Sequence, residues 1–223
     1  RDLLAPYSDL ISEDIIEGKW QPPISNGSGR DRKILRAALK LLSEAGYKQQ
    51  GGKLVDVNGN PLSFEILTKS EDEEKLAIAY KRSLDLVGIE ASIRAVDDAQ
   101  YQRRTQDFDY DMIIATLRAS LSPGNEQVNR WGSQSRDIPG TFNYAGAAEP
   151  AIDAAIDSLL NAKSSEEFQS SVRALDRLLI AGNYVVPLFH LSDQWIAKWN
   201  EVEHPEKAPI YGNQYPVWWS AQE

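Results

Sequence analysis

Apolar residues recur with helical spacing in several segments of this chain. From about residue 31 to residue 45 they lie three and four positions apart, which places them on one face of a helix, and Gly46 is well placed to end it. This apolar stripe consists of Ile34, Ala38, Leu41, Leu42 and Ala45. A helix is also predicted at about residues 72–87, where Ser70 and Glu73 offer a capping box, and a short polar helix at 99–106. Apolar spacing predicts two more, from Pro150 onwards and from Ser164 to about Gly182.

Shorter apolar runs between these helices predict strands. Two of them, at residues 53–57 and 62–68, flank Asn58-Gly59, which is a strong signal of a tight hairpin because both residues tolerate positive φ. Further strands are expected at residues 89–96, 110–116 and 184–191, the last an edge or bulged strand because it contains Pro187. Alternation of helices and strands indicates an α/β fold, with helices packed against the faces of a sheet.

The segment from Tyr110 to Trp131 is the most informative for function. Its apolar run at 112–115 resembles a buried strand and leads into a polar loop at 120–127. A buried strand fixes the position of the loop that follows it, and such loops often bind ligands. The loop offers hydroxyls, amides and one carboxylate, which favours gripping a polar ligand over transforming it. From composition alone, an ordinary turn at 122–125 is equally consistent with these residues.

Composition narrows the class of protein. The chain has 223 residues, of which 42% are hydrophobic and 26% charged, as in globular proteins. Its net charge of −9 argues against binding nucleic acid or anionic membranes. It contains no run of about 18 apolar residues and no cysteine, which excludes disulfides and thiolate sites. Met112 is the only methionine, so we expect a processed or excised piece of a longer protein.

Three regions are expected along the chain. Residues 1–28 are punctuated by prolines and glycines and predict a linker from something upstream. Residues 29–192 form the α/β domain. Residues 193–223 form an aromatic-rich tail that is expected to pack on this domain or on a missing neighbour. The aromatic residues of this C-terminal region are Trp195, Trp199, Tyr211, Tyr215, Trp218 and Trp219.

Signatures of catalysis, metals and cofactors are missing from the sequence. The two histidines, His190 and His204, do not have a metal-binding spacing, and a structural or surface role is favoured for both. No G-x-S-x-G nucleophile motif and no phosphate-binding glycine motif occurs. Alternating aspartates at positions 107, 109 and 111 favour a solvated strand edge over an acid–base pair. We therefore expect no enzyme, no cofactor and no metal.

Several motifs occur in an order that points to one family. They are the helix end Ser43-Glu44-Ala45-Gly46-Tyr47, the hairpin from Val57 to Leu67, the helix exit Gly88-Ile89, and the strand entry from Phe108 to Met112. Together they resemble the extracellular solute-binding proteins of family 5, the peptide-binding subunits of ABC importers. The resemblance covers about residues 30 to 200.

One branch of that family is more similar. The segments that carry this likeness are Ser120–Gln127, Trp131, Asn143-Tyr144, Ala174–Arg177 and Tyr184–Pro187, and they look like binding proteins for microcin C and cell-wall-derived peptides. The resemblance implies a lobe of the type II periplasmic binding protein fold, with a mixed sheet and helices on both faces. It also implies a two-lobed protein of the bacterial periplasm that delivers a peptide to permease subunits in the inner membrane. This chain would be its C-terminal lobe, without the N-terminal lobe.

The resemblance assigns the polar loop to one wall of a peptide cleft. The expected ligand-binding residues are Arg118, Ser120, Ser122, Asn125, Glu126, Gln127, Trp131, Asn143 and Tyr144. Arg118 pairs with a ligand carboxylate or forms an ordinary surface ion pair, and Trp131 packs on the ligand or, slightly favoured, fills the core. Ser120 stands about where better-known oligopeptide binders hold the peptide amine with an aspartate, and Leu117 replaces a usual tryptophan. The loop is therefore expected to grip its ligand without the usual amine clamp.

Two other classes of function compete with peptide binding. The aromatic tail could dock a protein partner, which would make the chain an interaction module. A hydrolase is a second rival, disfavoured by the missing nucleophile motif.

Overall fold

A computed structural model describes residues 2–117, 122–190, 195–207 and 214–221 of the chain. The chain divides into two compact units, Arg1–Tyr184 and Val185–Glu223. The first unit contains two hydrophobic cores, one around a parallel sheet and one among helices. Arg118 and Ser120, two of the expected ligand contacts, lie outside the described residues.

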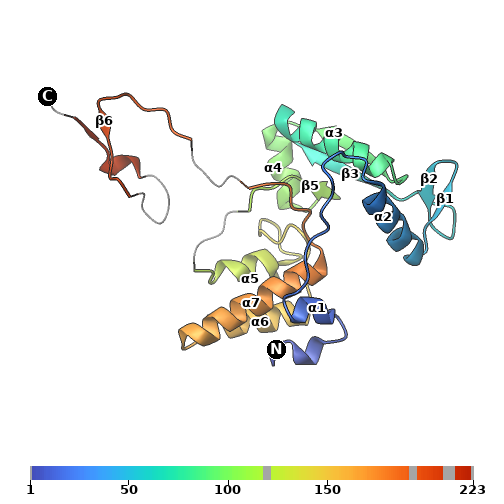
Figure 1. The fold of residues 1–223 in the computed structure, drawn as a ribbon, viewed down its shortest axis with the longest axis horizontal. Coiled ribbons are helices and arrows are strands. Elements are labelled where there is room, and N and C mark those ends of the chain that lie inside the picture. The colour runs from blue at the N-terminus through green and yellow to red at the C-terminus, as the bar shows by residue number, and fades with distance from the viewer. Residues whose placement is uncertain (1, 118–121, 191–194, 208–213, 222–223) are drawn as a thin grey trace. The chain divides into compact units, whose positions relative to one another are not determined.

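The sheet of the first unit has β3 (Ser63–Thr68) at its centre. On one side β3 pairs with β4 (Glu90–Ala95), and on the other side with β5 (Met112–Ile113). Both pairings are parallel. Parallel neighbours need a crossover between them, and here helices α3 (Glu71–Asp85) and α4 (Asp98–Gln106) supply it. Figure 1 shows β3 and β5 beside helices α3 and α4.

The two crossover helices cover opposite faces of the sheet. Ile66 of β3 packs in one core with Ala77 and Leu84 of α3. Glu65 points to the other face because side chains alternate along a strand, and there it forms an ion pair of 3.4 Å with Arg104 of α4. This arrangement confirms the expected α/β class with helices on both faces. Antiparallel pairs occur among the described residues as well, in separate two-stranded sheets.

The predicted hairpin pairs differently from expectation. Strand β2 (Lys53–Val55) is antiparallel to β1 (Lys48–Gln50), and the two-residue turn between them is Gly51-Gly52, with positive φ at both positions. Asn58-Gly59 does form a turn, but it leads into β3 with only an isolated bridge between Val55 and Pro61. The two strands and the turn are therefore confirmed, but the prediction that the strands pair with each other as a hairpin was wrong, because β3 uses both its edges for parallel partners.

Helix α2 (Arg32–Glu44) precedes the hairpin and begins where the sequence predicts. The Asp31 side chain caps it by accepting hydrogen bonds from the backbone N–H groups of Lys33 and Ile34. None of its residues is fully buried, although one of its faces is strongly apolar. The helix thus has the expected amphipathic pattern without a fully buried face.

The second core of this unit lies among helices. It joins α1 (Glu13–Ile16), α5 (Glu126–Trp131), α6 (Pro150–Leu160) and α7 (Ser165–Gly182) with the single turns η1 (Ala5–Tyr7) and η2 (Ser133–Ser135). Leu4, Ile11 and Ile15 are buried in this core. Part of the segment expected to be a linker is therefore packed, while its connection to an upstream lobe stays a prediction.

The second unit contains the aromatic tail. Strands β6 (Val202–Glu203) and β7 (Trp219–Ser220) pair in antiparallel fashion, and η3 (Tyr215–Val217) precedes β7. The Trp219 indole N–H donates to the Glu203 carboxylate at 3.0 Å. Trp195 is 95% exposed and Trp199 is 78% exposed. Packing of this tail on another body stays a prediction.

Two strand predictions need correction. The predicted strand at 184–191 is wrong over its described part, since residues 184–190 form no strand; Pro187, which has no backbone N–H, lies within this segment. The predicted strand at 110–116 is limited to Met112 and Ile113. The predicted helices are all present. Within the described parts of the chain, no helix is long and apolar enough to cross a membrane.

The helical core generates a stability prediction. Ile152 of α6 is 1% exposed, so replacing it with alanine removes buried methyl groups and leaves a cavity. We expect Ile152→Ala to lower the free energy of unfolding by about 2–5 kcal/mol in urea denaturation. Leu160 lies on the same helix but is 38% exposed, so Leu160→Ala is the matched control with a smaller loss. Equal losses for the two variants would contradict this placement of the core.

Candidate functional site

The predicted loop leaves the carboxyl edge of the parallel sheet. Strand β5 ends at Ile113, and residues 114–117 continue the chain toward 122–125 and helix α5. Because all three strands are parallel, β3 and β4 end at this same edge. Ligands of α/β proteins bind outside the carboxyl ends of parallel strands, so the location agrees with a binding role.

Tyrosine side chains make hydrogen bonds on both sides of the short strand β5. The Tyr101 hydroxyl donates to the Ile114 carbonyl at 3.2 Å, and the Tyr110 hydroxyl donates to the Tyr144 carbonyl at 2.9 Å. Burial raises the pKa of both Tyr101 and Tyr110 to about 12, so both phenols stay neutral donors at ordinary pH. The Lys69 ammonium lies 4.9 Å from the centre of the Tyr101 ring, within reach of a cation–π interaction. These contacts fix the backbone at Ile114, just after β5, and at Tyr144.

Glu126 organises the start of α5. Its two carboxylate oxygens each accept from the Gly124 backbone N–H at 3.0 Å, and one also accepts from the Gln127 amide at 3.1 Å. Burial raises the pKa of Glu126, but hydrogen bonds from its own backbone, Gly124 and Gln127, with the charge of Arg130, outweigh it and lower the pKa overall. The loop thus presents a half-buried, ionised carboxylate that can accept from a cationic or N–H group.

The remaining loop residues differ in accessibility. Ser122 and Asn125 are exposed, whereas the Gln127 side chain is buried beside Glu126. Asn125 precedes α5, and its side chain makes no capping hydrogen bond. Ser122 and Asn125 are therefore accessible to a ligand, while Gln127 acts on the shape of the loop.

Asn143 and Trp131 lie in the helical core instead of on an open surface. Asn143 is fully buried, and its amide nitrogen donates to the carbonyls of Gly132 at 3.1 Å and Ala147 at 2.8 Å. Its amide oxygen accepts from the Ala147 N–H at 2.8 Å. Trp131 packs against the core and lies 5.9 Å from Tyr184, ring centre to ring centre. These contacts give both residues a structural role, and direct ligand contact by either stays a prediction.

Tyr144 is half-buried and pairs with an exposed aromatic neighbour. Its ring makes an edge-to-face contact with Phe142, with ring centres 6.0 Å apart. Phe142 is 58% exposed. The pair offers an aromatic surface next to the backbone that receives the Tyr110 hydrogen bond.

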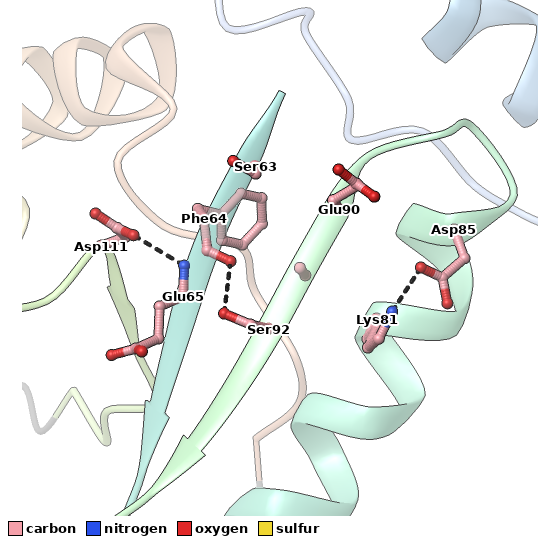
Figure 2. A pocket seen from close by; sticks show the side chains of 9 residues that line it. Ser63, Phe64, Glu65, Lys81, Asp85, Glu90, Ser92 and Asp111 are labelled. Carbon is pink, nitrogen blue, oxygen red and sulfur yellow. Dashed lines mark hydrogen bonds and ion pairs between the residues drawn. The ribbon is translucent and has the colours of Figure 1, made fainter. Parts of the chain in front are cut away.

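A hollow in the described surface lies at the opposite end of the sheet. It has a volume of about 470 Å³ and is found where β3 and β4 begin (Figure 2). Its charged groups already have partners. Lys81 pairs with Asp85 at 2.7 Å, Glu90 pairs with Lys53 at 2.7 Å, and Asp111 accepts from the Glu65 backbone N–H at 2.8 Å. Since it sits at the amino ends of the strands and its charges are compensated, we do not favour it as the functional site.

Sequence reasoning missed two residues beside the helical core. The Tyr184 hydroxyl donates to the carboxylate of Glu149, which directly precedes α6. Glu149-Pro150 signals a helix start, but no local signal pairs it with a tyrosine 35 positions later. Over the described residues, no group of three or more His, Cys, Asp or Glu side chains could hold a metal ion.

A comparison with protein families decides the classification. Residues 12–138 match the model of the bacterial extracellular solute-binding proteins, family 5 (middle region). The chain belongs to this family. The family 5 chain is also similar to longer proteins along its whole length. A Brucella melitensis protein is 53% identical over 223 residues, 100% of this chain and 36% of that protein. The peptidoglycan-binding protein YepA of Agrobacterium fabrum is 50% identical over 99% of this chain and 36% of its own.

The family 5 chain therefore spans about a third of the length of these relatives. Its fold is similar to that of solved solute-binding proteins. The oligopeptide-binding protein AppA of Bacillus subtilis, solved with a nonapeptide, aligns with a TM-score of 0.59 at 19% identity. The alignment covers 67% of this chain and 30% of AppA. The expected type II periplasmic binding protein fold is thereby confirmed.

The buried amide of Asn143 generates a second stability prediction. Asn143→Ala removes the acceptor of the Ala147 N–H and one donor each from the Ala147 and Gly132 carbonyls, and we expect it to lower the free energy of unfolding by about 2–4 kcal/mol. Chemical denaturation measures this loss. Asn125→Ala is the control, since Asn125 is exposed and should change stability by less than about 0.5 kcal/mol. A mild effect at Asn143 would mean that its three hydrogen bonds do not hold the turn.

Glu126 generates a prediction about pH. Because its pKa is lowered in the folded state, its contribution to stability is present above the unfolded pKa and is lost as the pH falls through the folded value. We expect the difference in melting temperature between wild type and Glu126→Gln to shrink from about pH 6 to about pH 3. Calorimetry across that range measures it. A difference that stays constant would show that the carboxylate charge is not stabilised in the loop.

Proposed function

We propose that this chain is part of the ligand-binding lobe of the substrate-binding component of an ABC importer, which captures a peptide or peptide-like solute without covalent chemistry. Membership of family 5 carries this proposal. Two further observations support it. A relative with 50% identity is named a peptidoglycan-binding protein, and the polar loop emerges at the carboxyl edge of the sheet.

The ligand would contact the loop from Ser122 to Gln127 and its neighbours. Glu126 is the strongest candidate, because it is ionised and its position is fixed by the Gly124 N–H. Ser122 and Asn125 are exposed beside it and supply a hydroxyl and an amide. Arg118, Ser120, Gln127, Trp131, Asn143 and Tyr144 complete the proposed set, with Trp131 and Asn143 acting from behind the loop.

The proposed partners follow from this role. The rest of the same protein would close over the ligand, and permease subunits in the inner membrane would recognise the closed state. A ligand that contacts both lobes stabilises the closed conformation by its differential affinity for it. The proposed location is the bacterial periplasm. No reaction is proposed, since the loop presents groups for gripping a ligand without an activated nucleophile.

The second candidate is a protein-interaction module that docks through the aromatic tail. The exposed indoles of Trp195 and Trp199 favour it, because large exposed apolar side chains often mark an interface. Their exposure is equally expected if the tail packs on the part of the relatives' length that this chain does not span. Peptide capture is therefore preferred.

Calorimetry of the full-length protein tests the proposal. Synthetic peptides and peptidoglycan fragments released by digestion are titrated into the protein, and we expect saturable heat from one of these two sets. Chromatography of the recovered ligand should show it unchanged. Absence of binding to every peptide and fragment, or turnover of any of them, would contradict the proposal.

The loop variant Glu126→Ala sharpens this test. Removing a charged hydrogen-bond acceptor should weaken binding of the probe by about tenfold or more. The control is Glu166→Ala, which removes an exposed carboxylate from the first turn of α7. Equal affinities for the two variants would remove Glu126 from the site while leaving peptide binding itself intact.

A further inference from the structure

Four side chains, together with backbone groups between them, form a series of contacts around the carboxyl end of α5. We name Trp131, Asn143, Glu149 and Tyr184 the α5 bracket. Trp131 is the last residue of α5, and its ring packs on that of Tyr184. The Tyr184 hydroxyl donates to the Glu149 carboxylate. The contacts therefore lead from α5 to the segment just after α7, and from there to the start of α6.

The return path of the bracket runs through Asn143. Glu149 accepts a hydrogen bond from the Ala148 N–H at 3.0 Å, and the preceding residue, Ala147, is held by Asn143. Asn143 in turn donates to the carbonyl of Gly132, the residue directly after Trp131. The series closes on itself, so displacement of any one member would disturb the others.

Two glycines leave room for the bracket. A Cβ atom at Gly132 would lie 2.6 Å from the Val128 carbonyl oxygen, too close for any larger residue without a shift of α5. A Cβ atom at Gly182 would overlap the Tyr184 ring. Asn183, with φ of 50°, then reverses the chain at the end of α7 just before Tyr184. The turn at Gly182 and Asn183 thus places the Tyr184 ring against Trp131 of α5.

Helix α5 needs this external support because it is short. It has six residues, and a helix of that length gains little stability from its own hydrogen bonds. Glu126 and Gln127 open the helix, and Trp131 closes it. The bracket holds only the closing end, and the helix transmits that position to the loop.

We propose that Tyr184 and Glu149 are positioning residues, which fix the orientation of α5 and through it the ligand affinity of the loop that contains Glu126. Neither residue was expected to contact the ligand. This inference rests on the proposed function in one respect only, that the loop at the start of α5 binds a ligand.

The bracket is tested in the full-length protein with Tyr184→Phe, Glu149→Ala and the double variant. Tyr184→Phe keeps the ring on Trp131 and removes only the hydroxyl. Each variant should weaken binding of the peptide or fragment that wild type binds, by up to about tenfold, since one hydrogen bond to a charged group is lost. The double variant should lose no more than either single variant, because both break the same contact.

Hydrogen exchange provides a measurement that needs no ligand. The backbone amides of Val128 to Trp131 should exchange faster in Tyr184→Phe than in wild type, while those of α3 stay unchanged. Tyr80→Phe is the matched control, since Tyr80 is a half-buried tyrosine on α3 and belongs to the other core. It should leave both the exchange of α5 and the affinity for the probe unchanged.

The outcomes separate the two proposals. Failure of wild type to bind any peptide or fragment contradicts the proposed function, and the exchange of α5 then still decides whether the bracket positions that helix. Binding by wild type with full affinity in both single variants overturns the inference, even if their melting temperatures fall. Additive losses of affinity in the double variant would also overturn it, because the two residues would then act separately.

Discussion

The parallel pairing of β3 with two neighbours is the constraint on which the sheet and the site depend. Leu67 at the centre of β3 is completely buried, as expected for a strand covered on both faces. A parallel partner on each side forces the chain to cross back twice, once through α3 and once through α4. All three strands therefore end at one edge, and the segment after β5 has to leave from there. The position of the polar loop follows from this connectivity before any side chain of the loop is considered.

The helices and the position of the loop could be predicted because their signals are local. Apolar spacing and a capping residue such as Ser70 act within a few positions of one another, so the sequence displays them directly. Strand pairing is a choice among distant partners. Asn58-Gly59 has the chemistry of a hairpin turn and does turn, yet β3 pairs in parallel with β4 and β5 and not with the short β2. The apolar segment after Asn183 was predicted to be a strand from its composition, but composition does not show whether a pairing partner is present.

The candidate site was predicted in outline and not in the roles of its members. A polar residue in a turn reads the same in sequence whether it faces solvent or a core, so Asn143 could pass for a ligand contact. Its complete burial and three hydrogen bonds emerge only in three dimensions. Glu149 and Tyr184 were missed because the hydrogen bond between them joins positions that are far apart in the sequence. The residue types of the loop could be recognised from the sequence, whereas the distant contacts that hold the loop in place could not.

The loop also connects two hydrophobic cores that have no buried residue in common. The chain leaves the core around Ile66 after β5 and reaches the core around Ile152 at α5. The hydrogen bond between Tyr110 and Tyr144 is a second link between these two parts of the chain. Regions of one protein that have separate cores can differ in their free energies of local opening. A solute that bound the loop and the residues on both sides of it would join these two cores. Such a solute would couple the local opening of one core to that of the other.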